Sequence, residues 1–301
     1  MKILLLGKNG QVGWELQRSL APLGEVIAVD RHTAGLQADL SDPEALGAMV
    51  RSIAPQVIVN AAAHTAVDRA ESEPQLARLL NAEAPGVLAR EARALDAWLV
   101  HYSTDYVFDG SGSAPWTEES ATHPLSVYGR TKLEGEDAIR GSGCRHLIFR
   151  TSWVYAARGS NFAKTMLKLA KERDRLTVVE DQIGSPTGAD LLADVTAHAI
   201  RLAQGRPEAG GTYHAVAQGV TSWHGYARHV IGFARSHGVP LAVADEAVEA
   251  VPSTAFPTPA ARPHNSRLDT RKLRETFGLT LPSWQSGVDR MLTEVLGTAD
   301  K

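Results

Sequence analysis

Tyr128 and Lys132 lie four residues apart in the stretch VYGRTKLEGE, and Thr104 lies upstream in HYSTDYVF. Residues four apart on a helix share one face, so a phenol and an ammonium could act on the same small volume. When hydride adds to a carbonyl carbon, negative charge builds on the oxygen and a nearby acid must protonate it. Tyr128 would be that acid, and Thr104 would hold the carbonyl oxygen by a second hydrogen bond.

Lys132 has two possible roles in this layout. The pKa of a free phenol lies near 10, and a neighbouring ammonium should favour the phenolate and lower that pKa. The same ammonium could bind a nicotinamide ribose. A Tyr and a Lys at this spacing are also typical of an ordinary helix surface, so the surrounding sequence has to decide between these readings.

Alternation along the strand that precedes Thr104 predicts which side chains share a face. In HYSTDYVF, Tyr102 and Thr104 should point to one side, and Ser103 and Asp105 to the other.

A glycine-rich turn, GKNGQVG, follows the first apolar run and places glycines at Gly7, Gly10 and Gly13. Glycines allow a tight turn and a close approach of backbone amides to a pyrophosphate, and a helix N-terminus adds N–H donors. A simple strand-to-helix turn is the alternative. Asp30, at the end of the second strand, could accept hydrogen bonds from ribose hydroxyls, whereas Arg31 could pair with a 2′-phosphate, so NADH and NADPH both remain open.

Two further segments could lie beside the cofactor. Asp39 and Leu40 could cover an adenine or could begin a helix. In NAAAHTAVD, three alanines would let the backbone pass close to a flat cofactor, and His64 and Thr65 could hydrogen-bond to its ribose or phosphates. A purely structural histidine is the alternative for His64.

The elements that would position these residues alternate between short apolar runs and helical patterns. Strands are predicted at 2–6, 26–29, 57–60, 98–103 and 146–153, and helices near 12–21, 43–53, 74–95 and 128–141. Strands separated by helices form right-handed crossovers and a parallel sheet covered on both faces. The fold class is therefore a doubly wound α/β sheet, the Rossmann type.

The second half of the chain departs from this regular alternation. It has a predicted helix at 161–173, a strand at 176–179 and a helix at 189–203. We predict a nucleotide-binding domain at 1–155 and a smaller substrate domain at 156–301. The helix at 189–203 could pack back onto the first domain.

Composition excludes several classes of protein. The 301 residues carry a formal net charge of −3 with no basic cluster, which argues against nucleic acid as a partner. No apolar run approaches the length of a membrane span. A single cysteine, Cys144, fits a reducing compartment, and the cytoplasm is the predicted location.

Several long motifs resemble the dTDP-4-dehydrorhamnose reductase family of the extended short-chain dehydrogenase/reductase superfamily. They include GKNGQVGWELQRSL, VNAAAHTAVDRAESEP, HYSTDYVFDG, RTSWVYA, NFAKTMLKLAKER and PTPAARPHNSRL, and they span nearly the whole chain. The resemblance implies NADPH- or NADH-dependent reduction of the C4 ketone of dTDP-6-deoxy-L-lyxo-4-hexulose to dTDP-L-rhamnose. It also implies a homodimer and a role in lipopolysaccharide biosynthesis.

The same resemblance implies a set of binding residues. The cofactor would contact Gly10, Gln11, Val12, Asp30, Asp39, Leu40, Ala63, His64, Thr65, Tyr102, Tyr128 and Lys132. The sugar nucleotide would meet Thr104, Asp105 and Trp153, although a buried core tryptophan is the alternative for the last. Some family members bind Mg²⁺ at a dimer contact, and the matching positions are Glu15, Asp190 and Glu294. Asp190 stands where the family pattern has the longer Glu.

Two other functions remain open. A sugar-nucleotide dehydratase or epimerase of the same superfamily is the nearest enzymatic rival, but dehydratases place Asp and Glu directly after the strand-end Thr. Here Asp105 and Tyr106 follow Thr104, so one acid/base group is missing. A non-catalytic NAD(P)-binding regulatory subunit is the rival from another class, because fold alone does not settle function.

Overall fold

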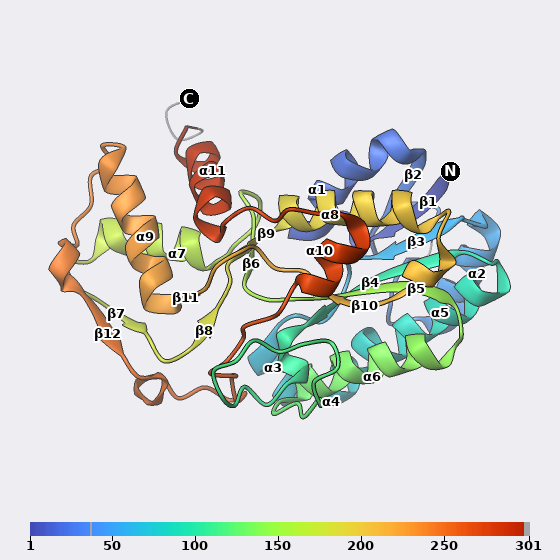
Figure 1. The fold of residues 1–301 in the computed structure, drawn as a ribbon, viewed down its shortest axis with the longest axis horizontal. Helices are drawn as coiled ribbons and strands as arrows, with labels where there is room; N and C mark the ends of the chain where they lie inside the picture. The colour runs from blue at the N-terminus through green and yellow to red at the C-terminus, as the bar shows by residue number, and fades with distance from the viewer. Residues whose placement is uncertain (37, 298–301) are drawn as a thin grey trace.

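A six-stranded sheet lies at the centre of the larger domain, with strand order β10-β5-β4-β3-β1-β2 and every pairing parallel. The computed structural model describes residues 1–36 and 38–297 (Figure 1). The strands are β1 (Lys2–Leu6), β2 (Glu25–Val29), β3 (Val57–Asn60), β4 (Trp98–Thr104), β5 (Arg145–Thr151) and β10 (Gly211–His214). The predicted Rossmann-type fold class is confirmed. The inner strands are apolar because helices cover both faces.

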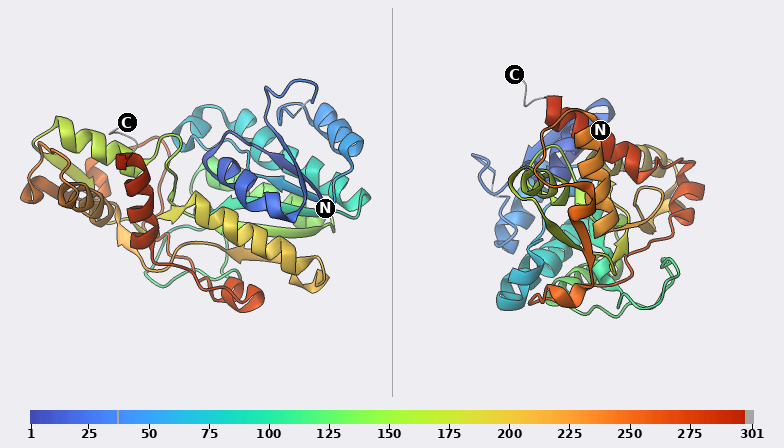
Figure 2. Two further views of the ribbon diagram at one scale, coloured as in Figure 1. Left: turned by 90° about the horizontal axis from the view of Figure 1, so that it is seen from above. Right: turned by 90° about the vertical axis from the view of Figure 1, so that its left-hand side faces the viewer.

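Helices cover the sheet in two layers. One layer contains α1 (Gln11–Leu20), α8 (Ala189–Ala203) and α10 (Arg271–Phe277), whose apolar side chains share one core cluster with the sheet. The opposite layer contains α2 (Pro43–Ile53), α5 (Ala84–Ala94) and α6 (Val127–Gly141), which form the second cluster (Figure 2). None of the helices among the described residues is long and apolar enough to cross a membrane.

The helix predicted at 74–95 is interrupted in the structure. After α3 (Val67–Ser72), the chain forms α4 (Pro74–Arg78), a π-helical turn (Leu79–Glu83) and α5. Pro85 lacks an N–H and cannot bond to the carbonyl four residues back, that of Asn81. Gly135 of α6 packs against that carbonyl, and a Cβ built on Gly135 would lie 2.1 Å from the Asn81 oxygen.

The smaller domain packs α7 (Phe162–Glu172), α9 (Trp223–Ser236) and α11 (Trp284–Gly297) around its own apolar cluster. β7 (Leu176–Val179) pairs in parallel with β12 (Val248–Val251). Short pairs join β8 (Ile183–Gly184) to β11 (Thr221–Ser222) and β6 (Val154–Tyr155) to β9 (Thr187–Gly188). Single 3₁₀ turns lie at Ala21–Leu23, Asp105–Val107, Pro207–Ala209, Asp245–Ala247 and Ser253–Ala255.

The chain crosses between the two domains more than once. Helix α8 packs along α1, and β10 pairs with β5 as the sixth strand of the large sheet. Both elements come from the segment 156–301. The sequence leaves open that the helix at 189–203 packs back onto the first domain, but it predicts no strand of the large sheet in this segment. The chain therefore returns to the larger domain, for α8, β10 and α10, between the segments that build the smaller domain.

Candidate active site

The glycine turn after β1 has a separate physical reason for each of its three glycines. Gly7 has φ +86°, a left-handed conformation, and a Cβ there would lie 2.9 Å from the backbone of Ala61. Gly10 stands at the N-cap of α1, where it has no side chain to cover the first helical N–H groups. Gly13 packs against Gly7 itself. This turn can admit a pyrophosphate to the helix N-terminus.

Gly13→Ala is expected to destabilise the fold and weaken dinucleotide binding. The new Cβ would lie 2.0 Å from the Gly7 carbonyl oxygen, so the turn would have to shift, at a cost of about 1 to 3 kcal/mol. Urea unfolding and titration of cofactor fluorescence measure the two effects. Gly141→Ala is the control, because its added Cβ would meet no atom within 4 Å apart from its own stretch of helix backbone. Unchanged binding in Gly13→Ala would contradict the role of this packing.

Asp30 faces the glycine turn from the end of β2. Its carboxylate accepts hydrogen bonds from Asn9 Nδ2, from the His32 N–H at 3.0 Å and from the Thr33 hydroxyl at 2.9 Å. Burial alone would raise the pKa of this carboxyl, but these hydrogen bonds outweigh it and the pKa is lowered. Asp30 is thus a fixed anion beside the turn. Arg31 is exposed and donates to His32 at 3.1 Å.

Asp39 and Leu40 have different surroundings. The Asp39 carboxylate accepts from the Ser41 N–H and hydroxyl at 2.9 and 2.8 Å, and those bonds hold its pKa low. The charges of Arg31 and His32 lower this pKa further, which places Asp39 in the neighbourhood of Asp30. The Leu40 side chain is buried in the core between the sheet and α2.

The segment after β3 is held by a residue that the sequence reasoning missed. The buried Asn81 amide accepts from the His64 N–H at 2.8 Å and donates to the His64 carbonyl at 3.1 Å. It also donates to Thr131 of α6 at 3.1 Å. The His64 ring lies 3.6 Å from Glu73, while Thr65 is exposed. A polar residue within an apolar helical pattern was the only sequence signal for Asn81.

Thr104, Asp105 and Tyr128 come together where β4 ends. The Thr104 hydroxyl donates to Asp105 Oδ1 at 3.1 Å and accepts from the Tyr106 N–H at 3.2 Å. The Thr104 side chain also lies close enough to the Tyr128 phenol to lower its pKa. The prediction that Thr104 and Asp105 face opposite sides is wrong, because the strand stops at Thr104 and a 3₁₀ turn begins at Asp105.

The start of α6 places Tyr128 close to this strand end. Ser126 caps the helix by accepting from the Gly129 N–H at 3.1 Å. Gly129 has a steric role, since a Cβ there would lie 2.2 Å from the Tyr106 carbonyl oxygen. The glycine beside Tyr128 therefore allows the helix to approach the turn that carries Asp105. The rings of Tyr106 and Tyr128 meet edge to face at 5.4 Å.

The pKa of Tyr128 is raised to about 12, chiefly by burial, although the neighbouring Thr104 side chain lowers it and the Asp105 charge raises it. Lys132 is absent from these causes, so the predicted lowering of this pKa by Lys132 is wrong. The reason is geometric. The Lys132 amine donates to the Tyr102 carbonyl and lies 3.1 Å from His101 Nε2.

The side chains of Tyr102 and Asp105 have different neighbours. The Tyr102 hydroxyl lies 2.6 Å from the Thr196 hydroxyl of α8, so its ring faces the layer of α1 and α8. Asp105 is 2% exposed, and burial raises its pKa to about 6, although hydrogen bonds from Ser266 and Thr104 lower it. This carboxyl is therefore ionised at neutral pH and becomes protonated in mildly acidic solution.

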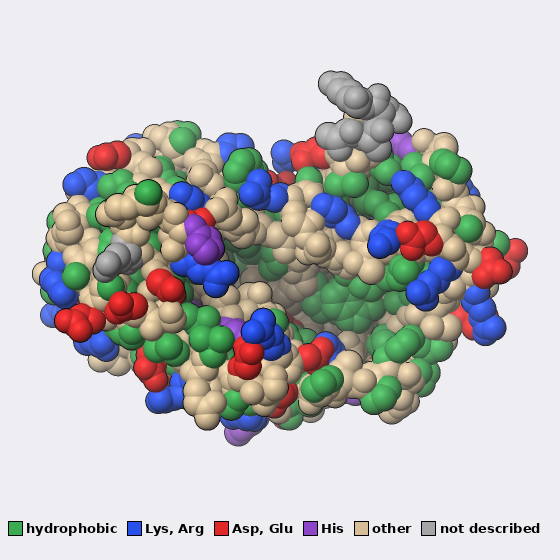
Figure 3. All heavy atoms as spheres, turned by 180° about the vertical axis from the view of Figure 1, so that it is seen from behind, with side chains coloured by type: hydrophobic (Ala, Val, Ile, Leu, Met, Phe, Trp, Pro, Cys, Tyr) green, Lys and Arg blue, Asp and Glu red, His purple; other side chains and the backbone are tan. Residues whose placement is uncertain are grey.

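Trp153 connects the two domains. Its ring stacks on Trp223 of α9, with ring centroids 3.6 Å apart, and lies against Gly184. The backbone of Trp153 is left-handed, with φ +50°, a conformation that costs a non-glycine residue about 1 to 3 kcal/mol. Trp153 is partly exposed rather than buried in a core. Figure 3 shows that the face opposite to Figure 1 is hollowed between the domains.

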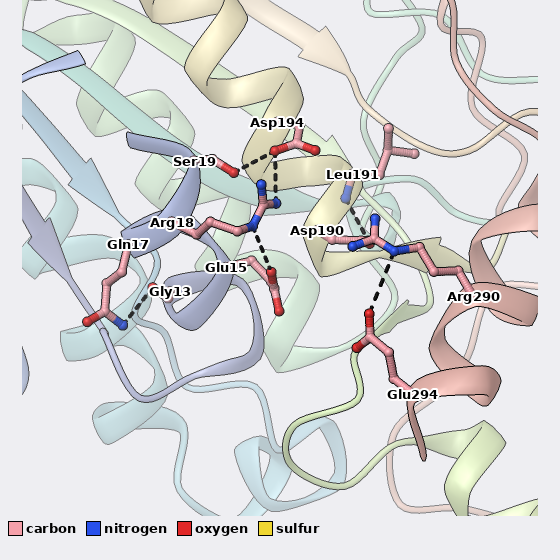
Figure 4. Close-up of polar contacts among 10 residues, drawn as sticks. All are labelled: Gly13, Glu15, Gln17, Arg18, Ser19, Asp190, Leu191, Asp194, Arg290 and Glu294. Atoms are coloured by element: carbon pink, nitrogen blue, oxygen red, sulfur yellow. Dashed lines mark hydrogen bonds and ion pairs between the residues drawn. The ribbon is translucent and has the colours of Figure 1, made fainter. Parts of the chain in front are cut away.

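The three carboxylates predicted to bind Mg²⁺ do not form a cluster in one chain (Figure 4). Glu15 lies 3.6 Å from Arg18, and Arg290 lies 3.1 Å from Asp190 and 3.6 Å from Glu294. Within residues 1–36 and 38–297, no group of three or more His, Cys, Asp or Glu side chains could hold a metal ion. Arg18 and Arg290 already pair with these carboxylates, so the single chain does not offer them as a set of Mg²⁺ ligands.

A buried ion pair supports α6 from the sheet side. Arg150 of β5 donates to Glu136 through Nε at 2.9 Å and through Nη2 at 2.7 Å. Both side chains are buried, and Arg140 also donates to Glu136 at 2.8 Å. The sequence reasoning missed this pair, because nothing in the local pattern connects a residue in a helix to one in the next strand.

Comparisons with known proteins agree over the whole chain. The family model described as RmlD substrate binding domain matches residues 1–296. The dTDP-4-dehydrorhamnose reductase of Escherichia coli strain K12 is 59% identical over 298 residues, which cover 99% of this chain and 99% of that protein.

Solved structures show the same likeness. A dTDP-4-dehydrorhamnose reductase from Clostridium acetobutylicum has a TM-score of 0.87 at 36% identity, covering 98% of this chain and 100% of that one. One from Bacillus anthracis, in complex with NADP, has a TM-score of 0.86 at 33% identity, covering 97% and 99%.

Proposed function

Because the chain belongs to the dTDP-4-dehydrorhamnose reductase family of oxidoreductases, we propose that it reduces the C4 ketone of dTDP-6-deoxy-L-lyxo-4-hexulose to dTDP-L-rhamnose. The observation that carries the proposal is the meeting of Thr104, at the end of β4, with Tyr128, at the start of α6. Both hydroxyls lie at the carboxyl edge of the sheet, where doubly wound folds bind their ligands.

Residues of the glycine turn and its surroundings fit a dinucleotide. Gly7 and Gly13 keep the turn tight, Gly10 leaves the first N–H groups of α1 uncovered, and the Asp30 carboxylate stands beside them. A reduced nicotinamide bound here would supply the hydride that forms the new C4–H bond. The predicted cofactor contacts of Ala63, His64 and Thr65 belong to one segment. The Asn81 side chain would hold the backbone of this segment in place through its hydrogen bonds to His64.

Tyr128 performs the proton transfer in this proposal. Its raised pKa keeps the phenol protonated throughout the neutral range, which is the form a proton donor requires. The Oη–H bond breaks, the proton passes to the sugar O4, and a phenolate remains to be reprotonated from solvent. Thr104 would turn its hydroxyl from Asp105 to the O4 atom, and Trp153 would offer an apolar ring face to the deoxysugar.

The rival functions make different demands on the site. A dehydratase needs a glutamate after Asp105, but Tyr106 occupies that position and packs its ring against Tyr128. A regulatory subunit would need no acid at all, yet Thr104 and Tyr128 are retained in contact. These observations favour carbonyl reduction.

Purified protein is expected to oxidise NADPH or NADH when it is given the keto sugar nucleotide made in situ. Loss of absorbance at the reduced-nicotinamide band should match the amount of keto sugar, and running both cofactors in parallel measures the preference between them. Absence of turnover with every 4-keto sugar nucleotide, together with a partner that co-purifies in equal amount, would support the regulatory subunit instead.

The homodimer, the Mg²⁺ ion, the role in lipopolysaccharide biosynthesis and the cytoplasmic location stay predictions. Since Arg18 and Arg290 pair with the carboxylates concerned, we derive no step of the reaction through a metal. Sedimentation of the protein with Mg²⁺ and with a chelator tests whether the ion favours an assembly of two chains.

A further inference from the structure

The buried side chains of Lys132, His101 and Asn60 form a row, and it begins on the helix that carries the proposed proton donor. The Lys132 amine of α6 lies 3.1 Å from His101 Nε2 of β4, and His101 Nδ1 lies 3.2 Å from Asn60 Nδ2 of β3. Each of the three side chains is at most 2% exposed. Such a row must distribute its hydrogens without solvent, so the donor or acceptor character of each nitrogen constrains the next.

The orientation of Asn60 fixes the hydrogens of the row at one end. The Ala62 N–H donates to Asn60 Oδ1 at 3.2 Å, so the Nδ2 group is the one that faces His101. An amide NH₂ can only donate, and His101 Nδ1 must therefore accept. A neutral imidazole with a bare Nδ1 has its hydrogen on Nε2.

That hydrogen points at Lys132. An ammonium has three donors and no acceptor, so an ammonium opposite the His101 Nε2–H would place two donors face to face. An amine has a lone pair, which can accept from His101 while the amine donates to the Tyr102 carbonyl. We propose that Asn60 and His101 favour the neutral amine of Lys132, so that Lys132 gives up its proton in mildly alkaline solution, where the other lysines keep theirs.

The charged and titratable groups around the row leave this arrangement intact. Strand β4 contributes His101 and the Tyr102 carbonyl, and α6 itself contributes Tyr128 and Glu136. Glu136 favours the ammonium, but Arg150 of β5 and Arg140 already pair with its carboxylate. Burial lowers the pKa of Lys132 to about 8, and burial lowers the pKa of His101 well below its ordinary value.

The functional meaning of this row of side chains rests on the proposed reduction. Once Lys132 has lost its proton in mildly alkaline solution, it no longer adds a positive charge that would stabilise the phenolate, so Tyr128 keeps its proton there. His101 and Asn60 are positioning residues in this scheme, because they act only through Lys132.

The test is a pH titration of the lysine Nζ resonances by ¹⁵N NMR, with Lys132→Met to assign the resonance. We expect Lys132 to titrate near pH 8, well below the other lysines. In His101→Gln the amide oxygen can accept from an ammonium, so the pKa of Lys132 should rise by about one unit, a tenfold gain in proton affinity. His146→Gln, a substitution in a histidine bonded to the Cys144 carbonyl, is the control and should change nothing.

Asn60→Asp provides a second variant that keeps the imidazole. Its carboxylate would accept from His101 Nδ1–H, move the bare nitrogen to Nε2 and so also raise the pKa of Lys132. Titration of Lys132 together with the other lysines, or an unchanged pKa in both variants, would overturn the proposal. The measurement needs no turnover, so it can fail while the reductase activity stands, and the activity can fail while it succeeds.

Discussion

Tyr128→Phe is expected to lower kcat by roughly 10² to 10⁴-fold, the range for loss of a general acid. The substitution removes only the hydroxyl whose pKa the neighbouring Thr104 lowers, and it leaves the aromatic ring against Tyr106. Cofactor binding should therefore persist, because the glycine turn and Asp30 lie on other elements. Steady-state rates with the keto sugar nucleotide and cofactor fluorescence titration separate the two effects.

Tyr226→Phe is the matched control for this prediction. The Tyr226 hydroxyl is buried in the core of the smaller domain, and among the described residues it has no hydrogen-bond partner. Its removal should leave kcat close to that of the unmodified protein. Full activity in Tyr128→Phe would remove Tyr128 from the role of proton donor and would leave the proton to water or to Asp105.

Glu136→Gln is expected to lower the free energy of unfolding by about 3 kcal/mol, because it leaves the buried Arg150 guanidinium without its carboxylate. Arg140 loses the same partner. Urea unfolding measures the change. Burial would raise the pKa of Glu136, but the hydrogen bonds and charge of Arg150 outweigh burial and lower it. This contribution to stability is present above the ordinary carboxyl pKa and is lost as the pH falls through the lowered value.

Glu134→Gln, on the same helix, is the control for Glu136→Gln. Glu134 pairs with Arg78 at 2.8 Å, but both side chains are about half exposed, and such pairs contribute about 0 to 1 kcal/mol. The double variant Glu136→Gln/Arg150→Met should recover part of the loss, since neither charge is then left buried alone. Equal effects of the two single Glu substitutions would show that burial does not set the strength of the Arg150 pair.

Local patterns in the sequence were sufficient for the elements and for the residues that lie at their ends. The apolar runs predicted five of the six parallel strands, and the spacing of Tyr128 and Lys132 placed both on one helix, α6. The glycines at 7, 10 and 13 predicted a turn between a strand and a helix. These features depend on neighbours within a few positions along the chain, and periodicity reports those relations directly.

The sequence could not predict the partners that set the chemistry of those residues. Lys132 meets His101, 31 positions away, and His101 meets Asn60, 41 positions away. Asn81 reaches His64 because a π-helical turn replaces the continuous helix that the pattern predicted. The sixth strand, β10, comes from the segment 156–301, which the sequence pattern assigns to the substrate domain.

The sequence by itself determined the fold class, the family motifs and the identity of the hydroxyl and amine groups at the site. Only the tertiary structure decided their states: the pKa of Tyr128 is raised rather than lowered, and Lys132 faces β4 rather than the phenol. The physical reason is that a pKa depends on burial and on charges and dipoles within a few ångströms. The packing of separate segments sets those distances, and a local sequence pattern carries no record of them.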